Sequence, residues 1–185
     1  MHNLPNLISF LRLLLVPLTV WLIISDEFGW AFAVFLVAGV SDGLDGLLAR
    51  RFGWRSRLGA YLDALADKAL LVSIFLTLGF LRIIPAWLVL IVVSRDVLII
   101  TAVLLSRLLD HPVQVSPLRV SKINTAVQIL FAVALLGFAA VSWPILGLIT
   151  YGAVPVALLT ILSGAAYLQS WLRHMAGQPP EEHVP

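Results

Sequence analysis

The sequence lacks cysteine and is poor in charged residues. With no Cys among its 185 residues, the chain can form neither disulfides nor thiolate sites, and its redox compartment stays open. Only 12% of the residues are charged, about half the proportion of a typical soluble domain. Hydrophobic residues make up 61% of the chain, and its mean hydropathy is +1.01. A water-soluble protein of this length could not bury so much apolar surface, so we expect lipid to be the solvent.

Several other features are missing. The formal net charge is only +2 and the basic residues form no stripe, so we expect no nucleic-acid partner. The N-terminus has no basic region followed by a small-residue cleavage site, so we expect no signal peptide. Internal repeats and low-complexity tracts are absent. We therefore predict one membrane domain over residues 1–175, followed by a polar, proline-containing tail at 176–185 that is disordered.

Six apolar runs approach the roughly 20 residues needed to cross a bilayer. They predict an all-α integral membrane protein with six transmembrane helices, at Leu7–Ser25, Phe28–Ala49, Leu58–Leu81, Pro85–Ser106, Ile123–Trp143 and Ile145–Leu172.

Basic residues are distributed unequally between the two ends of these spans. If both termini lie on one side, the opposite side receives a single basic residue, Arg82. The positive-inside rule then places the termini and the second and fourth connectors in the cytoplasm, at the inner membrane. The basic residues on that side are Arg50, Arg51, Arg55, Arg57, Arg107, Arg119, Lys122 and Arg173.

Charged residues also occur inside the apolar runs. Each would cost about 2.5–3.5 kcal/mol at a helix centre, so each must face a polar cavity, a partner charge or a metal. Intramembrane charges are functional candidates by default, although a structural ion pair between Lys68 and Asp96 is an equally good interpretation of those two. The residues concerned are Asp42, Asp45, Asp63, Asp67, Asp96, Arg12, Lys68 and Arg95.

Spacing distinguishes four of the aspartates. Asp42 and Asp45 are three residues apart, and Asp63 and Asp67 are four apart, so each pair shares one helix face. The short connector between the spans predicts antiparallel neighbours whose four carboxylates converge. Such a cluster would repel itself unless cations neutralised it. Oxygen ligands suit Mg²⁺ or Mn²⁺, and four carboxylates suffice for two ions if one of them bridges.

Small residues accompany these acids. In a helix bundle they normally permit close packing, but beside the acids they would equally let a ligand approach the backbone. Arg50 could meet a phosphate at the cytoplasmic rim. The small residues are Gly43, Gly46, Ala49, Gly59, Ala60 and Ala64.

Together these positions form a recognisable pattern. It resembles the complete signature of the CDP-alcohol phosphatidyltransferases, and reads Asp42-x2-Asp45-Gly46-x2-Ala49-Arg50-x8-Gly59-x3-Asp63-x3-Asp67. The stretch from Leu4 to Arg12 is similar to the N-terminal segment of that family. Ser94-Arg95-Asp96 and the stretch from Ser121 to Gln128 are similar to segments of two branches, the phosphatidylglycerophosphate synthases and the CMP-forming cardiolipin synthases.

The resemblance implies a six-helix fold, usually homodimeric, with a polar cavity open to the cytoplasm. It also implies CDP-diacylglycerol as donor, an alcohol as acceptor, and divalent metal. By resemblance, the donor pyrophosphate meets metal held by Asp42, Asp45 and Asp63, and Asp63 bridges to a second ion. Asp67 holds that second ion and is the candidate general base. The residues that would accommodate the nucleotide are Gly46, Ala49 and Gly59, with Arg50 near its phosphates.

The acceptor is less well specified. An anionic acceptor needs cations, and the candidates are Lys122, Arg119 and Arg95, although topology or ion pairing would also explain them. Ser121 and Asn124 stand where glycerol-3-phosphate enzymes more often have glycine and a second lysine. One cation fewer favours phosphatidylglycerol, which would give cardiolipin, over glycerol-3-phosphate. Inositol phosphate, serine and choline remain as alternatives.

Two other functional classes would use buried carboxylates differently. An ion or proton transporter could use them as a relay, but neither inverted repeats nor broken helices are apparent. Acids gathered toward one membrane face also make no path across it. A purely structural membrane subunit would leave the cost of the acids without compensation.

Overall fold

A computed structural model describes the backbone of residues 4–52, 57–108 and 119–175, and the side chains of 10–41, 66–106, 108 and 120–175. Over these residues the predicted all-helical class is confirmed, with one helix for each apolar run. The helices are α1 (Leu4–Ile24), α2 (Phe28–Phe52), α3 (Arg57–Phe80), α4 (Ala86–Leu108), α5 (Arg119–Ala140) and α6 (Leu146–Met175). The predicted tail at 176–185 lies outside the described residues.

Two helices extend beyond their predicted ends into basic sequence. Helix α2 continues to Phe52, so Arg50 and Arg51 are helical rather than part of the connector. Helix α5 begins at Arg119, so Arg119 and Lys122 lie in its first turns. Hydropathy ends an apolar run at the first charged residue. Arg and Lys are nevertheless good helix formers, so the helix continues through them.

Three tight turns join the helices in pairs. In the first, the Glu27 amide donates to the Leu22 carbonyl at 2.9 Å and the Asp26 amide to the Ile23 carbonyl at 3.2 Å. This pair of bonds is the Schellman arrangement, which closes a helix with one residue in the left-handed region. The same pattern recurs in the other two turns. The left-handed residues are Asp26 (φ 62°), Arg82 (φ 58°) and Ser142 (φ 55°). This motif ends α5 at Ala140, before the predicted end at Trp143.

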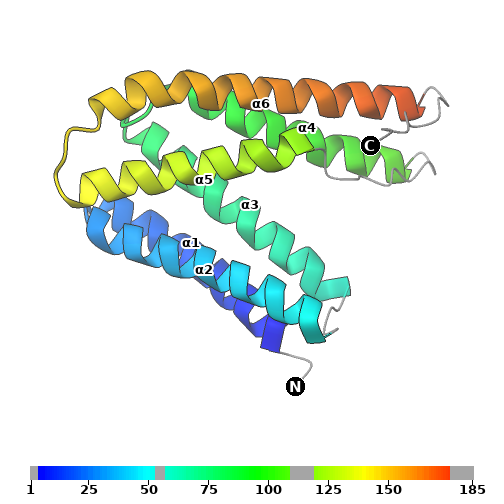
Figure 1. Cartoon of the computed structure of the whole chain (residues 1–185), viewed down its shortest axis with the longest axis horizontal. Helices are drawn as coiled ribbons and strands as arrows, with labels where there is room; N and C mark the ends of the chain where they lie inside the picture. Colours follow the sequence, from blue (N-terminus) through cyan, green and yellow to red (C-terminus); the bar gives the residue numbers. More distant parts are fainter. Residues whose placement is uncertain (1–3, 53–56, 109–118, 176–185) are drawn as a thin grey trace.

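The helices form two groups that separate toward one end (Figure 1). Helix α1 packs against α2 and α3, whereas α6 packs against α4 and α5. Contacts of α2 with α5 and of α3 with α4 join the groups. The start of α1 and the end of α6 lie at the same end, as predicted, and the three tight turns lie at the other (Figure 1). Although α2 and α3 are antiparallel as expected, α1 is the helix against which both of them pack.

The core lies toward the end with the tight turns, where the groups meet. Its centre includes Phe75 of α3, Leu88 of α4 and Leu136 of α5, all fully buried. Phe75 stacks on Phe131 of α5 with ring centroids 6.3 Å apart. Burial of such side chains contributes about 1.5–3 kcal/mol each, so this end of the bundle holds the two groups together.

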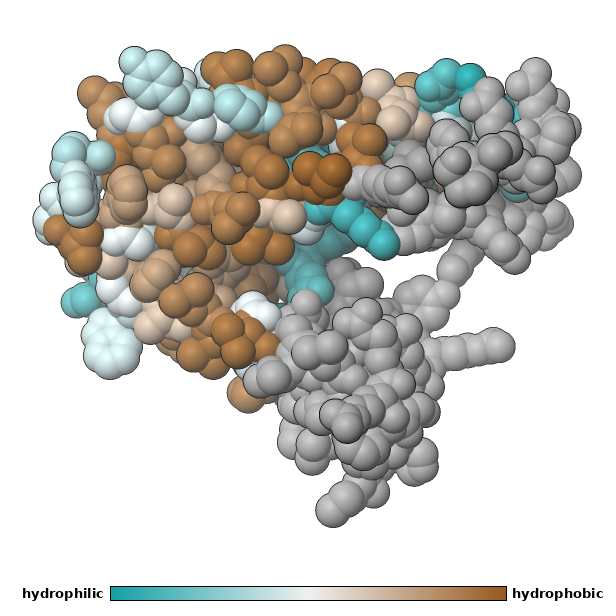
Figure 2. Space-filling model, in the orientation of Figure 1, coloured by the Kyte–Doolittle hydropathy of each residue, from teal (hydrophilic) through white to brown (hydrophobic). Residues whose placement is uncertain are grey.

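The outer surface is apolar. Large side chains of α4 and α6 are more than half exposed, as in Leu90, Leu158 and Ile161, and Figure 2 shows mostly hydrophobic colour on the described part of one face. Within the described residues, three stretches are long and apolar enough to cross a membrane: Ala86–Ser106, Val120–Ala140 and Leu146–Met175.

Exposed tryptophans lie close to the tight turns. Trp30, Trp87 and Trp143 are 45–67% exposed, and each is within a few residues of one turn. Tryptophan is enriched where a membrane meets water, so these positions fit a membrane interface at this end. Together with the apolar surface, they indicate a membrane protein.

One close approach between α3 and α4 depends on glycine. A Cβ at Gly79 would lie 2.5 Å from Cγ2 of Val89, whose β-branched side chain has little rotamer freedom. We expect Gly79→Ala to lower the unfolding temperature in detergent, because overpacking costs about 1–3 kcal/mol and exceeds the helix-propensity gain of about 0.5–1 kcal/mol.

Adding Val89→Ala to Gly79→Ala should restore most of the unfolding temperature that Gly79→Ala loses. Gly147→Ala is the matched control, because a Cβ there meets nothing within 4 Å. An unchanged unfolding temperature for Gly79→Ala would show that the helices are not this close.

Candidate functional site

A cavity of about 580 Å³ lies between the two helix groups. Its apolar wall includes Phe35 and Leu36 of α2, Leu71 of α3 and Ile129 of α5. Charged residues from α1, α3 and α4 line the remainder, namely Arg12, Asp67, Lys68, Arg95 and Asp96. Figure 2 shows a hydrophilic patch where this mostly apolar face is hollowed. The cavity can therefore contact an ionic group and a hydrocarbon chain at once.

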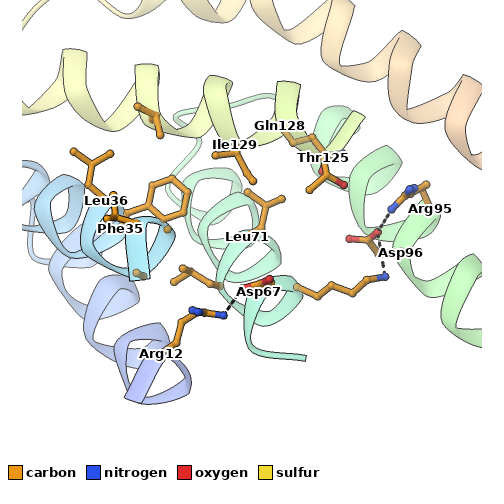
Figure 3. A pocket seen from close by; sticks show the side chains of 16 residues that line it. Arg12, Phe35, Leu36, Asp67, Leu71, Arg95, Asp96, Thr125, Gln128 and Ile129 are labelled. Carbon is orange, nitrogen blue, oxygen red and sulfur yellow. Dashed lines mark hydrogen bonds and ion pairs between the residues drawn. The ribbon is translucent and has the colours of Figure 1, made fainter. Parts of the chain in front are cut away.

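Asp67 is held in this cavity by Arg12. The Arg12 guanidinium donates through Nη1 to Oδ1 of Asp67 at 2.7 Å, and joins α1 to α3. The Arg12 side chain is 1% exposed and that of Asp67 is 44% exposed. Arginine thus neutralises the carboxylate from the protein side, while the carboxylate still reaches the cavity. In Figure 3, Asp67 lies between Arg12 and Asp96.

A second charged group follows on the α4 side. The Arg95 guanidinium donates through Nη1 to Oδ1 of Asp96 at 2.6 Å, and the Lys68 ammonium lies 3.8 Å from the same oxygen. The interpretation of Lys68 and Asp96 as a structural ion pair, which the sequence left open, is therefore supported, with Arg95 as the closer partner of Asp96. This group joins α3 to α4 beside Asp67 (Figure 3).

Arg95 also ties α4 to α5 and α6. Its Nη2 donates to the hydroxyl of Ser121 and to that of Ser163 at 2.9 Å. Gly164 lets the arginine stem pack closely, since a Cβ there would lie 3.5 Å from Cγ of Arg95. Arg95 lines the cavity but makes bonds to three side chains, and these bonds compensate the burial of its charge.

A buried polar network between α5 and α6 was not expected from the sequence. Gln128 donates to the Thr160 hydroxyl at 3.0 Å, and that hydroxyl lies 2.9 Å from the Asn124 carbonyl oxygen. All three side chains are almost fully buried. Asn124 and Gln128 are four residues apart and so share a helix face, but nothing in the sequence pattern identifies Thr160 as their partner.

The predicted site residues divide into those the structure describes and those it does not. Asp67 and Arg95 line the same cavity, and Lys122 is exposed near the start of α5. The other predicted residues have a described helical backbone, but their side chains lie outside the described residues. They are Asp42, Asp45, Asp63, Gly46, Ala49, Arg50, Gly59 and Arg119.

Of the four predicted metal ligands, Asp67 is the one whose side chain the structure describes. The described side chains contain no group of three or more His, Cys, Asp or Glu that could hold a metal ion. The backbone at 42–45 and 63–67 is helical, which is the conformation that the spacing argument assumes. Asp67 supplies a half-exposed oxygen donor in the cavity, which fits a hard divalent cation.

The contact of Arg12 with Asp67 is a second feature that the sequence did not predict. Arg12 was recognisable as a charge needing compensation inside an apolar run, and it ends the segment that resembles the family's N-terminus. Its partner lies 55 positions away, and only the packing of α1 on α3 brings the two together.

We expect a double-mutant cycle to detect this contact. Arg12→Gln and Asp67→Asn should each lower the unfolding temperature in detergent, and the double variant should lose less than the sum. Ion-pair partners in contact show coupling of about 0.5–3 kcal/mol.

Arg82→Gln combined with Asp67→Asn is the control, because Arg82 lies in the turn at the far end of α3. The changes in unfolding free energy caused by substitutions at distant sites add to within about 0.5 kcal/mol. Strict additivity of Arg12→Gln with Asp67→Asn would contradict the observed pair.

Known proteins resemble most of this chain. The cardiolipin synthase (CMP-forming) of Homo sapiens is 37% identical over 148 residues, covering 71% of this chain and 49% of that protein. The cardiolipin synthase (CMP-forming) of Streptomyces coelicolor is 40% identical over 116 residues, covering 60% and 54%.

A third relative is named for a different activity. It is the chloroplastic CDP-diacylglycerol–glycerol-3-phosphate 3-phosphatidyltransferase 1 of Oryza sativa, which is 35% identical over 151 residues, covering 72% of this chain and 46% of that protein. The chain thus spans about half the length of the curated relatives it matches. A family model described as CDP-alcohol phosphatidyltransferase matches residues 2–166, and the chain therefore belongs to the CDP-alcohol phosphatidyltransferase family.

Proposed function

We propose that this protein transfers a phosphatidyl group from CDP-diacylglycerol to an alcohol, with release of CMP, in phospholipid biosynthesis. The observation that carries the proposal is the family match over residues 2–166, which includes all eight positions of the motif at 42–67. The names of the relatives support the same reaction class. A cavity with charged and apolar walls suits substrates that combine phosphate with acyl chains.

The reaction exchanges one phosphorus–oxygen bond for another. The acceptor oxygen forms a bond to the β-phosphorus of the donor, the bond from that phosphorus to CMP breaks, and the hydroxyl proton needs a base. We assign Asp67 as this base, because its carboxylate is half exposed in the cavity where it can reach a hydroxyl directly or through water. Arg12 fixes the position of that carboxylate from α1.

Divalent metal, as two ions of Mg²⁺ or Mn²⁺, belongs to this proposal. Asp42, Asp45, Asp63 and Asp67 would hold it. When bound it would offset the negative charge that develops on the phosphoryl oxygens and on departing CMP. We assign Gly46, Ala49 and Gly59 to the space around the nucleotide and Arg50 to its phosphates, on the strength of the family motif.

The favoured acceptor is phosphatidylglycerol, which gives cardiolipin. Two of the relatives described above are named as cardiolipin synthases, and Ser121 and Asn124 reduce the positive charge expected for a phosphomonoester. Glycerol-3-phosphate is the second candidate, supported by the rice relative. Lys122, Arg119 and Arg95 remain the acceptor-binding residues predicted from sequence, although Arg95 already bonds three side chains.

The proposed location is the inner membrane, with six spanning helices and with both termini and the cavity mouth toward the cytoplasm. The common end of the termini supports it (Figure 1), as does the excess of basic residues there over the single Arg82 at the other end. A homodimer is proposed from the family resemblance.

The purified protein should release CMP from CDP-diacylglycerol only when a divalent cation and an acceptor are both present. The measurement is chromatography of CMP, with lipid mass spectrometry of the product from competing phosphatidylglycerol and glycerol-3-phosphate. Cardiolipin should predominate. A transporter or a structural subunit would release no CMP, and that result would refute the proposed activity.

Two aspartate variants should separate chemistry from binding. Asp67→Asn should lower turnover by about 10²–10⁴-fold, the usual contribution of a general base, while metal-dependent binding of the donor is largely retained. Asp45→Ala should weaken metal and donor binding together. Calorimetric titration and CMP release measure the two effects. Unchanged turnover in Asp67→Asn would remove it as the base, and undiminished metal affinity in Asp45→Ala would remove that residue as a ligand.

A further inference from the structure

Among the described cations that line the cavity, Lys68 makes the longest contact with a carboxylate. Among the described side chains, the cavity is lined by three cations, Arg12, Lys68 and Arg95, and by two carboxylates. Arg12 bonds Asp67 at 2.7 Å and Arg95 bonds Asp96 at 2.6 Å. Lys68 approaches Asp96 only to 3.8 Å, which is beyond hydrogen-bonding distance.

Asp96 does not need Lys68 for neutralisation. Arg95 already donates to the same oxygen, and the carboxylate is almost buried with 11% of its side chain exposed. The Lys68 side chain is 39% exposed on a flexible four-carbon stem. Its ammonium can therefore leave Asp96 without stranding an unpaired buried charge, which is the usual penalty for breaking such a pair.

The position of Lys68 relates it to the proposed chemistry. Lys68 follows Asp67 directly on α3, and both line the cavity. Asp67 is directed toward Arg12 on α1, and Lys68 is directed toward Asp96 on α4. The cavity between these two contacts is therefore flanked by the carboxylate of Asp67 and the ammonium of Lys68. In phosphatidylglycerol and glycerol-3-phosphate alike, a short glycerol unit separates the reacting hydroxyl from the phosphate. Because Asp67 and Lys68 line the same cavity, one molecule bound there can contact both.

We propose that Lys68 binds the phosphate of the acceptor and thereby brings the acceptor hydroxyl to Asp67. This assignment rests on the proposed function and identifies the acceptor as a phosphate-bearing alcohol. Lys68 exchanges Asp96 for the substrate phosphate, and Arg95 keeps Asp96 satisfied during the exchange. Ammonium groups bind phosphate as point charges with freely rotating donors, so Lys68 accepts either a phosphodiester or a phosphomonoester.

Kinetics of the full-length protein in mixed micelles test this role. Lys68→Gln should raise the acceptor KM about 10- to 100-fold, as expected for loss of a hydrogen bond to a charged group, with the donor KM nearly unchanged. Lys68→Arg should recover most of the affinity. Phosphatidylglycerol and glycerol-3-phosphate are assayed separately, and the acceptor KM should rise for each acceptor that the unaltered protein uses.

Two further variants distinguish phosphate binding by Lys68 from a general effect on the fold and from binding by Lys122. Arg82→Gln removes a cation from the far turn and should leave both KM values unchanged. Lys122→Gln tests the lysine predicted from sequence. The proposal is overturned if Lys122→Gln alone raises the acceptor KM, or if Lys68→Gln changes the donor and acceptor KM equally or lowers only the unfolding temperature.

A binding measurement separates this proposal from the proposed function. Calorimetric titration with short-chain phosphatidylglycerol or glycerol-3-phosphate, without donor, should show about 10- to 100-fold weaker binding to Lys68→Gln than to the unaltered protein. If the unaltered protein binds an acceptor but releases no CMP, the proposed function fails while the loss in Lys68→Gln still supports the phosphate contact. Equal binding by both proteins, or no binding by either, refutes the role of Lys68.

Discussion

A charge within an apolar helix bundle has to be neutralised by a group from another helix, and this requirement shapes the interior of the protein. Arg12 on α1 meets Asp67 on α3, and Arg95 on α4 meets hydroxyls from α5 and α6. These contacts lie where the two helix groups separate, away from the apolar core around Phe75. The polar contacts and the core therefore hold different regions of the same bundle.

This division has a functional consequence. Hydrophobic burial holds the bundle together near the tight turns, so the other end can separate and enclose a cavity of about 580 Å³. The carboxylate of Asp67 is braced by an arginine that is itself nearly inaccessible. A side chain that sits on a helix and is supported from behind keeps its geometry, as the proposed role of Asp67 as a base requires. The apolar wall beside it provides a surface for hydrocarbon, as the proposed transfer of a phosphatidyl group needs.

The Arg95–Asp96–Lys68 group shows how a structural contact and a binding site can share residues. Arg95 has exchanged solvation for bonds to three partners, and it acts as a tie between helices. Within that group, Lys68 contacts only Asp96, and only at 3.8 Å. A strong pair beside a weak one leaves the weak partner available to a ligand, because the strong pair keeps the buried carboxylate neutralised.

The number of helices, their approximate bounds and the family motif followed from the sequence alone. Apolar run length is a local property, and motif spacing on a helix needs only the helical period. Helix ends at Phe52 and Arg119 were misplaced because hydropathy does not detect helix that continues through charged residues. The pairing of Arg12 with Asp67, the packing of both α2 and α3 against α1, and Thr160 as the partner of Asn124 and Gln128 required the tertiary structure. These contacts join residues distant in sequence, and helix packing, which no local pattern encodes, decides which faces meet.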